Sequence, residues 1–388
     1  MAELKPGWQR VKFGEVVRLN KETCKDPMAA GIERVIGLEH LEPGDLRVRS
    51  WADVADGTTF TNRVRPGQVL FGKRRAYQRK VAVADFDAVC SGDIYVLESA
   101  DLNLLSPGLL PFICQTDAFF EHAVGTSAGS LSPRTNWRSL SEFEFSLPLL
   151  TEQQEILETV NCIEEAIESL SFLSFSVSRL RSALVEETLA RMRQESREAP
   201  LPSLCEVLTV GIVVTPAKYY VDDGGVPAVR SLNVWPGRFD LIDMKMLSAE
   251  GHAKHCKSSM RAGDVAIVRT GDPGRPGNAA VVHPEMEGWN CIDLILARPV
   301  NSIRPEYLEC FLNSPRSQIL LSGLSPGTKQ KHLSVTELSR LAVPVPPLEA
   351  QDRLIVQLNT LSKAIHQAQT RLDDAKAVKR QILQSLEI

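Results

Sequence analysis

The sequence of 388 residues lacks the features of several large protein classes. It has no run of about 18 apolar residues, which argues against a membrane-spanning helix. Its first residues, Met1 to Pro6, lack the apolar core of a signal peptide. None of its eight cysteines form a Cys-x-x-Cys pair, so we expect reduced and mostly buried thiols. We therefore expect a cytoplasmic protein that does not contact a membrane.

Motifs of catalysis and cofactor binding are also missing. The sequence has no G-x-G-x-x-G or G-x-S-x-G motif, no Asn-Pro-Pro-Tyr or Asp-Pro-Pro-Tyr segment of adenine methyltransferases, and no nuclease carboxylate cluster. Residues 67–74 nearly match a phosphate-binding loop, but Arg74 replaces its hydroxyl residue. His252, His255 and Cys256 have no fourth ligand at a matching spacing, which favours surface residues over a metal site. We expect no catalytic residue, metal or cofactor in this chain.

An internal repeat with a period near 198 residues is the strongest feature of the sequence. Two segments, 150–193 and 348–386, contain neither proline nor glycine, and their apolar residues alternate at spacings of four and three. Such a stripe over several heptads predicts a coiled coil. Its predicted core residues are Ile156, Val160, Ile163, Ile167, Leu170, Leu354, Leu358, Leu361, Ile365 and Leu372.

The charges of the two segments predict their direction. Glutamates crowd the first half of segment 150–193, whereas lysines and arginines crowd the last half of segment 348–386. Antiparallel pairing brings these opposite charges together. The alternative is that each helix only complements its own dipole, with acids first and bases last.

The repeat extends into the segments before each helix. Residues 93–97 match 293–297, and Gly125-Thr126 with Leu131-Ser132 match Gly327-Thr328 with Leu333-Ser334. Short β-rich runs alternate with Gly, Pro and Asp, which predicts an α+β domain in each copy. We expect strands near 68–71, 81–84, 94–97, 265–268 and 279–282, short helices near 107–115 and 305–312, and a linker over 191–200.

One basic stretch predicts a binding surface. No acidic residue lies between Asp56 and Asp85, a stretch that contains seven lysines and arginines. Clustered bases are typical of nucleic-acid binding, although a solvated charged turn is the alternative. The second copy has less basic and different loops, as expected if the copies read two different half-sites. The candidate DNA-binding residues are Lys73, Arg74, Arg75, Tyr77, Gln78, Arg79, Lys80, Thr126, Ser127, Arg269, Thr270, Arg275, Lys329, Gln330 and Lys331.

The junctions before the two helices support a resemblance to a known family. Residues 147–156 read LPLLTEQQEI and residues 343–351 read VPVPPLEAQ. Both resemble the proline-rich helix entry of the specificity subunits of type I restriction-modification systems. Leu149 replaces a usual proline, and Glu349 lies one position early. Residues 71–93 also resemble a form of target recognition domain found in this family.

The resemblance implies a complete organisation. Target recognition domains would cover 1–146 and 198–344. The first spacer helix with its linker would cover 147–197, and the second helix 345–388. The fold would be α+β, with the two helices forming an antiparallel coiled coil around a pseudo-twofold repeat.

The resemblance also implies a function. Each domain would read one half of an asymmetric, bipartite site in double-stranded DNA, with the gap set by the coiled coil. Two methyltransferase subunits would bind S-adenosylmethionine, and restriction subunits would use ATP and magnesium. Family members of this kind are not enzymes by themselves.

Two other functions remain open. One alternative is the specificity subunit of another restriction or defence system, which neighbouring genes would distinguish. A duplicated coiled-coil scaffold that binds proteins and not DNA is the alternative of a different class. The scaffold would be favoured if the lysines and arginines of the basic stretch and loops were buried or salt-bridged within the fold. The missing motifs argue against a self-contained nuclease or methylase.

Overall fold

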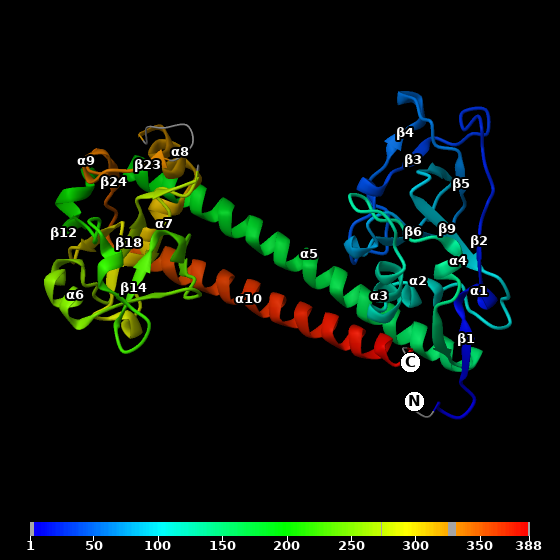
Figure 1. The fold of residues 1–388 in the computed structure, drawn as a ribbon. Coiled ribbons are helices and arrows are strands. Elements are labelled where there is room, and N and C mark those ends of the chain that lie inside the picture. The colour runs from blue at the N-terminus through cyan, green and yellow to red at the C-terminus, as the bar shows by residue number, and fades with distance from the viewer. Residues whose placement is uncertain (1–3, 273, 325–330, 387–388) are drawn as a thin grey trace. The chain divides into compact units, whose positions relative to one another are not determined.

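The computed structural model describes residues 4–272, 274–324 and 331–386. The chain forms two compact units, one of Met1–Ser171 with Gln369–Ile388 and one of Phe172–Ala368. Each unit combines a globular part with segments of two long helices, α5 (Leu150–Glu195) and α10 (Leu348–Gln384) (Figure 1). No helix in the described part of the chain is long and apolar enough to cross a membrane.

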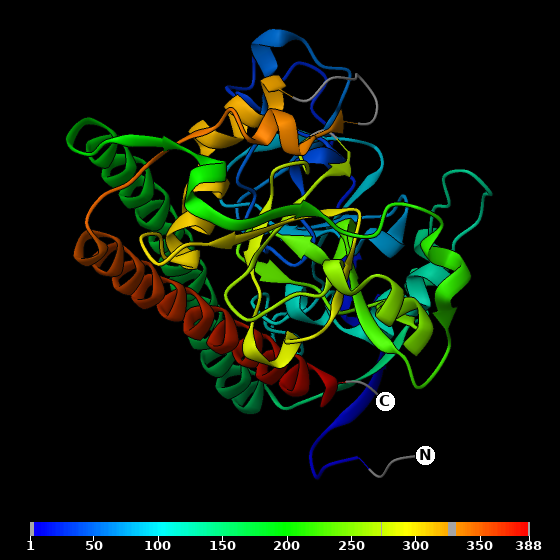
Figure 2. The same ribbon diagram turned by 90° about the vertical axis from the view of Figure 1, so that its left-hand side faces the viewer.

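The long helices pack against each other in opposite directions. In the first unit, Leu157 and Val160 near the start of α5 share a core with Leu383 near the end of α10. In the second unit the ends are reversed, because Leu189 of α5 shares a core with Leu354 of α10. Figure 2 shows the red end of α10 beside the first turns of α5. The predicted antiparallel pair is therefore confirmed.

The predicted stripe lies on the packed faces of α5 and α10. Each of its ten core residues is buried or half-buried. The expected charge complementarity is also present in the first unit. There, Lys379 of α10 forms an ion pair with Glu164 of α5 and donates a hydrogen bond of 2.7 Å to Gln115 Oε1.

Two four-stranded sheets form the globular part of the first unit. The first has the order β2-β9-β6-β7 and the second the order β4-β3-β8-β5, with β3 parallel to β8. A separate strand pair, β1 with β10, is antiparallel. The bounds are β1 (Gln9–Lys12), β2 (Val17–Leu19), β3 (Arg34–Ile36), β4 (Ala52–Asp53), β5 (Asn62–Val64), β6 (Val69–Gly72), β7 (Val81–Val83), β8 (Ala88–Cys90), β9 (Ile94–Ser99) and β10 (Glu144–Leu147).

The second unit repeats the first sheet and the parallel pair of this plan, but the outer strand of its second sheet differs: β13 pairs with β17, whereas β5 pairs with β8 in the first unit. Its sheets have the orders β12-β22-β18-β20 and β13-β17-β14-β21, with β14 parallel to β21, and β11 pairs with β24. The bounds are β11 (Glu198–Pro200), β12 (Cys205–Val210), β13 (Tyr220–Val221), β14 (Val226–Arg230), β17 (Lys245–Leu247), β18 (Val265–Val268), β20 (Ala279–Val281), β21 (Asn290–Ile292), β22 (Leu294–Pro299) and β24 (Ala342–Pro344). The predicted internal repeat of α+β domains is confirmed.

Short pairs and helices complete the two units. The small strand pairs are β15 (Val234–Trp235) with β16 (Arg238–Phe239) and β19 (Thr270–Gly271) with β23 (Lys331–His332). The short helices are α1 (Phe13–Val16), α2 (Leu110–Ile113), α3 (Asp117–Gly125), α4 (Trp137–Leu140), α6 (Ala249–Lys254), α7 (Pro305–Asn313), α8 (Pro315–Leu324) and α9 (Val335–Leu338).

Two details of the sequence interpretation are wrong. Residues 191–195 continue α5, and β11 is already part of a strand pair, so 191–200 is not a linker. The pairing of Leu131-Ser132 with Leu333-Ser334 is also out of register. The Thr135 amide donates to Lys73 O as the Leu333 amide does to Arg269 O, at 3.0 and 2.8 Å. Thr135 therefore corresponds to Leu333, and the match from short sequence fragments was displaced by four residues.

A buried glutamate lies between two elements of the second unit. Glu309 of α7 accepts a hydrogen bond of 2.8 Å at Oε2 from the backbone amide of Val281 in β20. Burial raises the pKa of the Glu309 carboxyl to about 7, although the Val281 amide opposes the shift. The carboxyl is therefore protonated in the folded protein at pH values where an unfolded chain has already lost the proton.

This glutamate predicts a pH dependence of stability. Between its ordinary pKa of 4.5 and about 7, the folded state binds more protons than the unfolded state. The free energy of unfolding should therefore fall with rising pH in this window, by up to about 3 kcal/mol, and then level off. Glu309→Gln keeps the acceptor for Val281 and should flatten the profile. The exposed Glu285 of the same unit is the control, because Glu285→Gln should leave the pH profile of denaturant midpoints unchanged.

Candidate nucleic-acid interface

The tip between β6 and β7 has a constrained backbone. Residues 76–78 form a short 3-10 turn, and the residues at its two ends, Arg75 and Arg79, both have a φ of 55°. Left-handed backbone at two arginines is uncommon and holds the turn in one shape. Tyr77 is 56% exposed and Arg79 is also exposed, so the turn presents an aromatic ring and a guanidinium to solvent.

The tip cations have partners within the first unit. Arg74 forms an ion pair of 3.3 Å with Asp93, and Arg79 forms one with Asp117. Lys73 lies 4.7 Å from the centre of the Tyr95 ring. Lys80 donates a hydrogen bond of 2.7 Å to Leu38 O, while Arg75 reaches the Ser132 hydroxyl at 3.4 Å, and Gln78 is half-buried.

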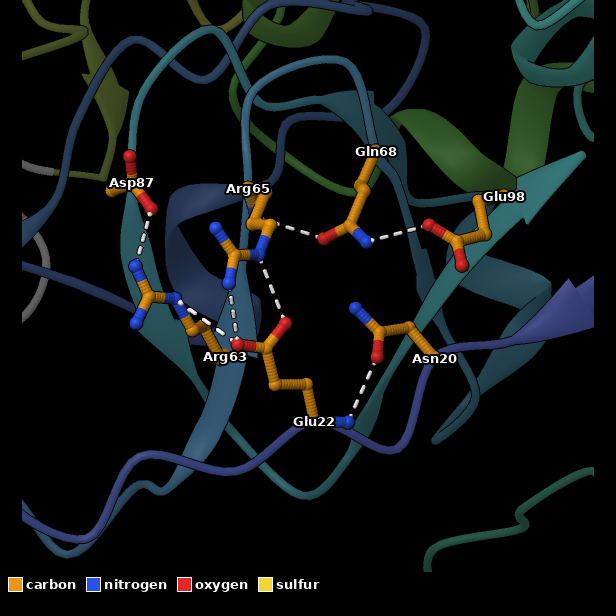
Figure 3. Close-up of polar contacts among 7 residues, drawn as sticks. All are labelled: Asn20, Glu22, Arg63, Arg65, Gln68, Asp87 and Glu98. Atoms are coloured by element: carbon orange, nitrogen blue, oxygen red, sulfur yellow. Dashed lines mark hydrogen bonds and ion pairs between the residues drawn. The ribbon is translucent and has the colours of Figure 1, made fainter.

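The two arginines before the tip are also paired (Figure 3). Glu22 lies 2.7 Å from Arg65 and 3.6 Å from Arg63, which also contacts Asp87 at 3.0 Å. The stretch therefore finds its acidic partners outside residues 56–85, although no acidic residue lies within the stretch itself. Exposed ion pairs contribute only about 0–1 kcal/mol, so these guanidiniums can exchange a carboxylate for a phosphate at low cost.

A second loop lies directly against the tip. The Arg75 amide donates to Pro133 O at 2.7 Å, and Arg134 donates to Asp93 Oδ1 at 2.8 Å. The Arg134 hydrogen bond lowers the pKa of the Asp93 carboxyl, which two guanidiniums therefore keep ionised. The Thr126 and Ser127 hydroxyls, proposed as DNA contacts, donate to the carbonyls of His122 and Ala123 at the end of α3. Bridges of Arg134 to Arg74 and to Ala128 thus place the loop that follows Thr126 and Ser127 beside the tip.

The second unit builds its tip around an equivalent aspartate. Asp293, which precedes β22 as Asp93 precedes β9, accepts hydrogen bonds from Arg269 and Thr270. Arg275 donates to Ser231 O at 2.7 Å and lies 4.4 Å from the centre of the Trp235 ring. The candidates Lys329 and Gln330 lie outside the described residues. Lys331 pairs through its backbone with Gly271, and its side chain is not described.

Sequence reasoning missed the residues that organise both tips. Asp93 and Asp293 were matched as part of the repeat, and an aspartate at the same point of both copies was the available signal. No comparable sequence signal pointed to Trp235, the ring that Arg275 contacts.

The histidines considered as metal ligands have another role. His252 Nδ1 lies 2.7 Å from Asn290 Nδ2. Among the described residues, no group of three or more His, Cys, Asp or Glu side chains is placed to hold a metal.

Comparison with known proteins supports the resemblance of the junctions. The family model described as the type I restriction modification DNA specificity domain matches residues 6–171. The EcoDI specificity subunit of Escherichia coli is 31% identical over 131 residues, which cover 31% of this chain and 28% of that protein. The EcoBI specificity subunit of Escherichia coli is 23% identical over 309 residues, which cover 69% of this chain and 63% of that protein. The chain thus spans less than two thirds of the length of these curated relatives.

Solved structures share the complete fold. The type I restriction-modification S subunit from M. genitalium superposes with a TM-score of 0.61 at 16% identity, covering 100% of this chain and 98% of that chain. A chain from a structural study of the assembly and conformational transition of a type I restriction-modification system superposes with a TM-score of 0.58 at 19% identity, covering 99% of both. These likenesses confirm the predicted architecture.

Proposed function

We propose that this chain is the DNA-recognition subunit of a type I restriction-modification complex, because the model of the specificity domain matches residues 6–171 and type I specificity subunits are among its relatives. Each unit reads one half of an asymmetric, bipartite site in double-stranded DNA. The observation that carries this proposal is one strand order in the sheets that carry the tips, β2-β9-β6-β7 and β12-β22-β18-β20, with different side chains at the two tips. A shared frame presents both tips in the same way, and different side chains recognise different bases.

The chemistry of the tips supports contact with DNA. The first tip presents Arg79 and Tyr77 at the surface, together with Arg74, which forms an ion pair of 3.3 Å with Asp93. The second tip offers Arg275, which is stacked on Trp235. Guanidiniums contact phosphates and the edges of guanine, so both tips carry groups that bind DNA. Their different arrangement accounts for an asymmetric site.

The long helices supply a spacer in this proposal. The 37 residues of α10 span about 55 Å at 1.5 Å per residue, which corresponds to about 16 base pairs of duplex. A fixed helical length would give a fixed gap between the two half-sites.

Catalysis would reside in partner subunits. Two methyltransferase subunits with S-adenosylmethionine would modify adenine, and restriction subunits with ATP and magnesium would cut DNA. This chain would bind none of these cofactors and would act in the cytoplasm, docking its partners onto the recognised site.

Methylation mapping tests the proposal. The chain is co-expressed with its neighbouring methyltransferase subunit in a host without other DNA methylation, and N6-methyladenine is read across the genome. A two-part asymmetric motif with a constant gap is expected. A stable complex with an active methyltransferase that leaves no such motif would contradict DNA recognition by this chain.

The spacer predicts the effect of a shortened coiled coil. Deleting one heptad from both α5 and α10 removes about 10 Å of helix, so the gap of the methylated motif should shrink by about three base pairs while both half-sites stay the same. The same mapping measures it. An unchanged gap in an active variant would rule out the helices as the spacer.

The ion pairs of the first tip favour one alternative in part. Salt-bridged tips are the feature expected of a scaffold that binds proteins and not DNA, and Arg63, Arg65, Arg74 and Arg79 are all paired. Such a scaffold would form the same complex with its partners and leave the genome without a two-part motif. The mapping experiment therefore distinguishes the two functions.

A further inference from the structure

An arginine of the first unit contacts two aromatic rings. Arg34 lies in β3, and the central carbon of its guanidinium is 4.3 Å from the centre of the Trp51 ring and 4.2 Å from the centre of the Phe86 ring. The two rings contact each other edge to face, with centroids 5.1 Å apart. Contact with both rings restricts the orientation of the guanidinium, and the N–H groups that point away from the rings stay available for hydrogen bonds.

The edges of Arg34 are unpaired within the described residues. No carboxylate oxygen in that part of the chain lies within 4.0 Å of its guanidinium, and no side-chain hydrogen bond joins it to another described residue. Its neighbours differ, because Arg47 and Arg49 lie 3.0 and 3.2 Å from Glu168 of α5. A half-buried arginine with free donors, restricted by contact with two rings, is prepared to bind a ligand.

The arginine lies at an open hollow of about 440 Å³. The hollow is lined by Arg34, Arg47, Val48, Arg49, Trp51, Asp85 and Phe86. Of its three guanidiniums, Arg47 and Arg49 are paired with Glu168 and Asp45, so Arg34 supplies the free donors, and the Trp51 ring is 43% exposed at the rim. A guanidinium with free planar donors matches a phosphate, which accepts paired hydrogen bonds from arginine.

The second unit lacks this arrangement. Arg34 forms the first pair of the parallel register between β3 and β8, opposite Ala88. The first pair of the corresponding register between β14 and β21 is Ala228 with Asn290. Ala228 is fully buried and carries no charge. The hollow is therefore a property of the first unit and not of the shared frame.

We propose that this hollow binds a backbone phosphate of the DNA, with Arg34 as its bidentate donor. The inference rests on the proposed function and adds a contact far along the chain from the 73–80 tip. Arg47 and Arg49 are held by Glu168 and Asp45, so Arg34 alone supplies the fork. A phosphate is the occupant, because the planar donors of one guanidinium match two oxygens of a tetrahedral anion. Such a contact adds affinity without reading sequence.

Three variants test the proposal in the complex with its methyltransferase partner. Binding to a duplex that contains the mapped site is measured at several salt concentrations. Arg34→Met keeps a long apolar side chain against the rings but removes the charge and the donors. It should bind about ten-fold more weakly and reduce the slope of log affinity against log salt by about one, with the same methylated motif. Arg34→Lys, which keeps the charge but not the fork, should fall between Met and wild type.

The exposed Arg138 of α4 provides the control, because its replacement by methionine also removes one positive charge. Arg138→Met should bind as wild type does, and all variants should melt at the wild-type temperature. Wild-type affinity and salt slope in Arg34→Met, an equal loss in Arg138→Met, or a methylated motif altered at one base would each overturn the phosphate site. A wild-type complex without sequence-specific binding would instead overturn the proposed function, and this inference with it.

Discussion

Replacing Gln153 with leucine is expected to lower the free energy of unfolding of the first unit by about 3 kcal/mol or more. Gln153 lies in the first turns of α5 and is fully buried. Its Oε1 accepts from the Ser106 amide at 2.9 Å, and its Nε2 donates to Leu104 O at 2.7 Å and to Pro148 O at 2.9 Å. Leucine fills similar space but leaves three backbone groups without partners where water reaches them poorly.

Denaturant unfolding measures this loss, and the chain offers close controls. Gln154 is the exposed neighbour, and Gln154→Leu should change the midpoint little. Gln153→Glu keeps the acceptor for Ser106 but lacks the two donors, so it should also be strongly destabilising. Gln351 makes the same three bonds in the second unit, to the Arg304 amide and to Ser302 O and Pro346 O, and Gln351→Leu should match Gln153→Leu. Wild-type stability in both leucine variants would disprove the role of this amide.

These glutamines show which features of the fold could be predicted from the sequence and which could not. The junction motif around Gln153 and Gln351 supported the family resemblance, and the four-three spacing predicted both long helices, because each pattern lies within one short segment. No pattern in the sequence indicates that either amide holds a loop 47 to 49 residues away. The strand order was equally inaccessible, because β2 pairs with β9 some 80 residues later, and such pairing depends on the complete chain.

The partners of the basic stretch were inaccessible for a related reason. Residues 57–84 contain no acid, whereas Glu22, Asp93 and Asp117 reach this stretch from elements outside that window. The contact of Arg34 with two rings was missed because Trp51 and Phe86 are distant in sequence and neither is part of a motif. The location of the tip could be predicted from its flanking strands, but its partners required the fold.

A second large effect is expected for the ion pair between Asp264 and Arg298. Asp264 is 1% exposed, and Arg298 donates to its two carboxylate oxygens at 2.7 and 2.8 Å. The Arg261 amide donates to the same carboxylate at 2.8 Å. Arg298→Met leaves a buried charge without its partner and should lower the free energy of unfolding by about 3–5 kcal/mol. The exposed pair of Arg304 and Asp352 is the control, since Arg304→Met should cost about 1 kcal/mol or less in the same denaturant titration.

The first unit shows why this pair need not be ionic. There Gln68 replaces the aspartate and Glu98 replaces the arginine, joined by a hydrogen bond of 2.9 Å between Gln68 Nε2 and Glu98 Oε2, as Figure 3 shows. Gln68 Oε1 also accepts from the Arg65 amide at 2.8 Å, as Asp264 does from Arg261. Both residues of the pair therefore differ between the two copies, whereas the turn that they stabilise is the same.

The exchange can be tested directly in the second unit. Arg298→Glu alone places two carboxylates together and should destabilise more than Arg298→Met does, because like charges repel where one of them is buried. Adding Asp264→Gln recreates the pair of the first unit and should restore most of the lost stability. A double variant as unstable as Arg298→Glu would show that the surrounding strands, and not the pair, determine which residues the turn accepts. Recovery would show that each copy diverged by compensated changes within a conserved frame, which leaves its tips free to acquire different DNA contacts.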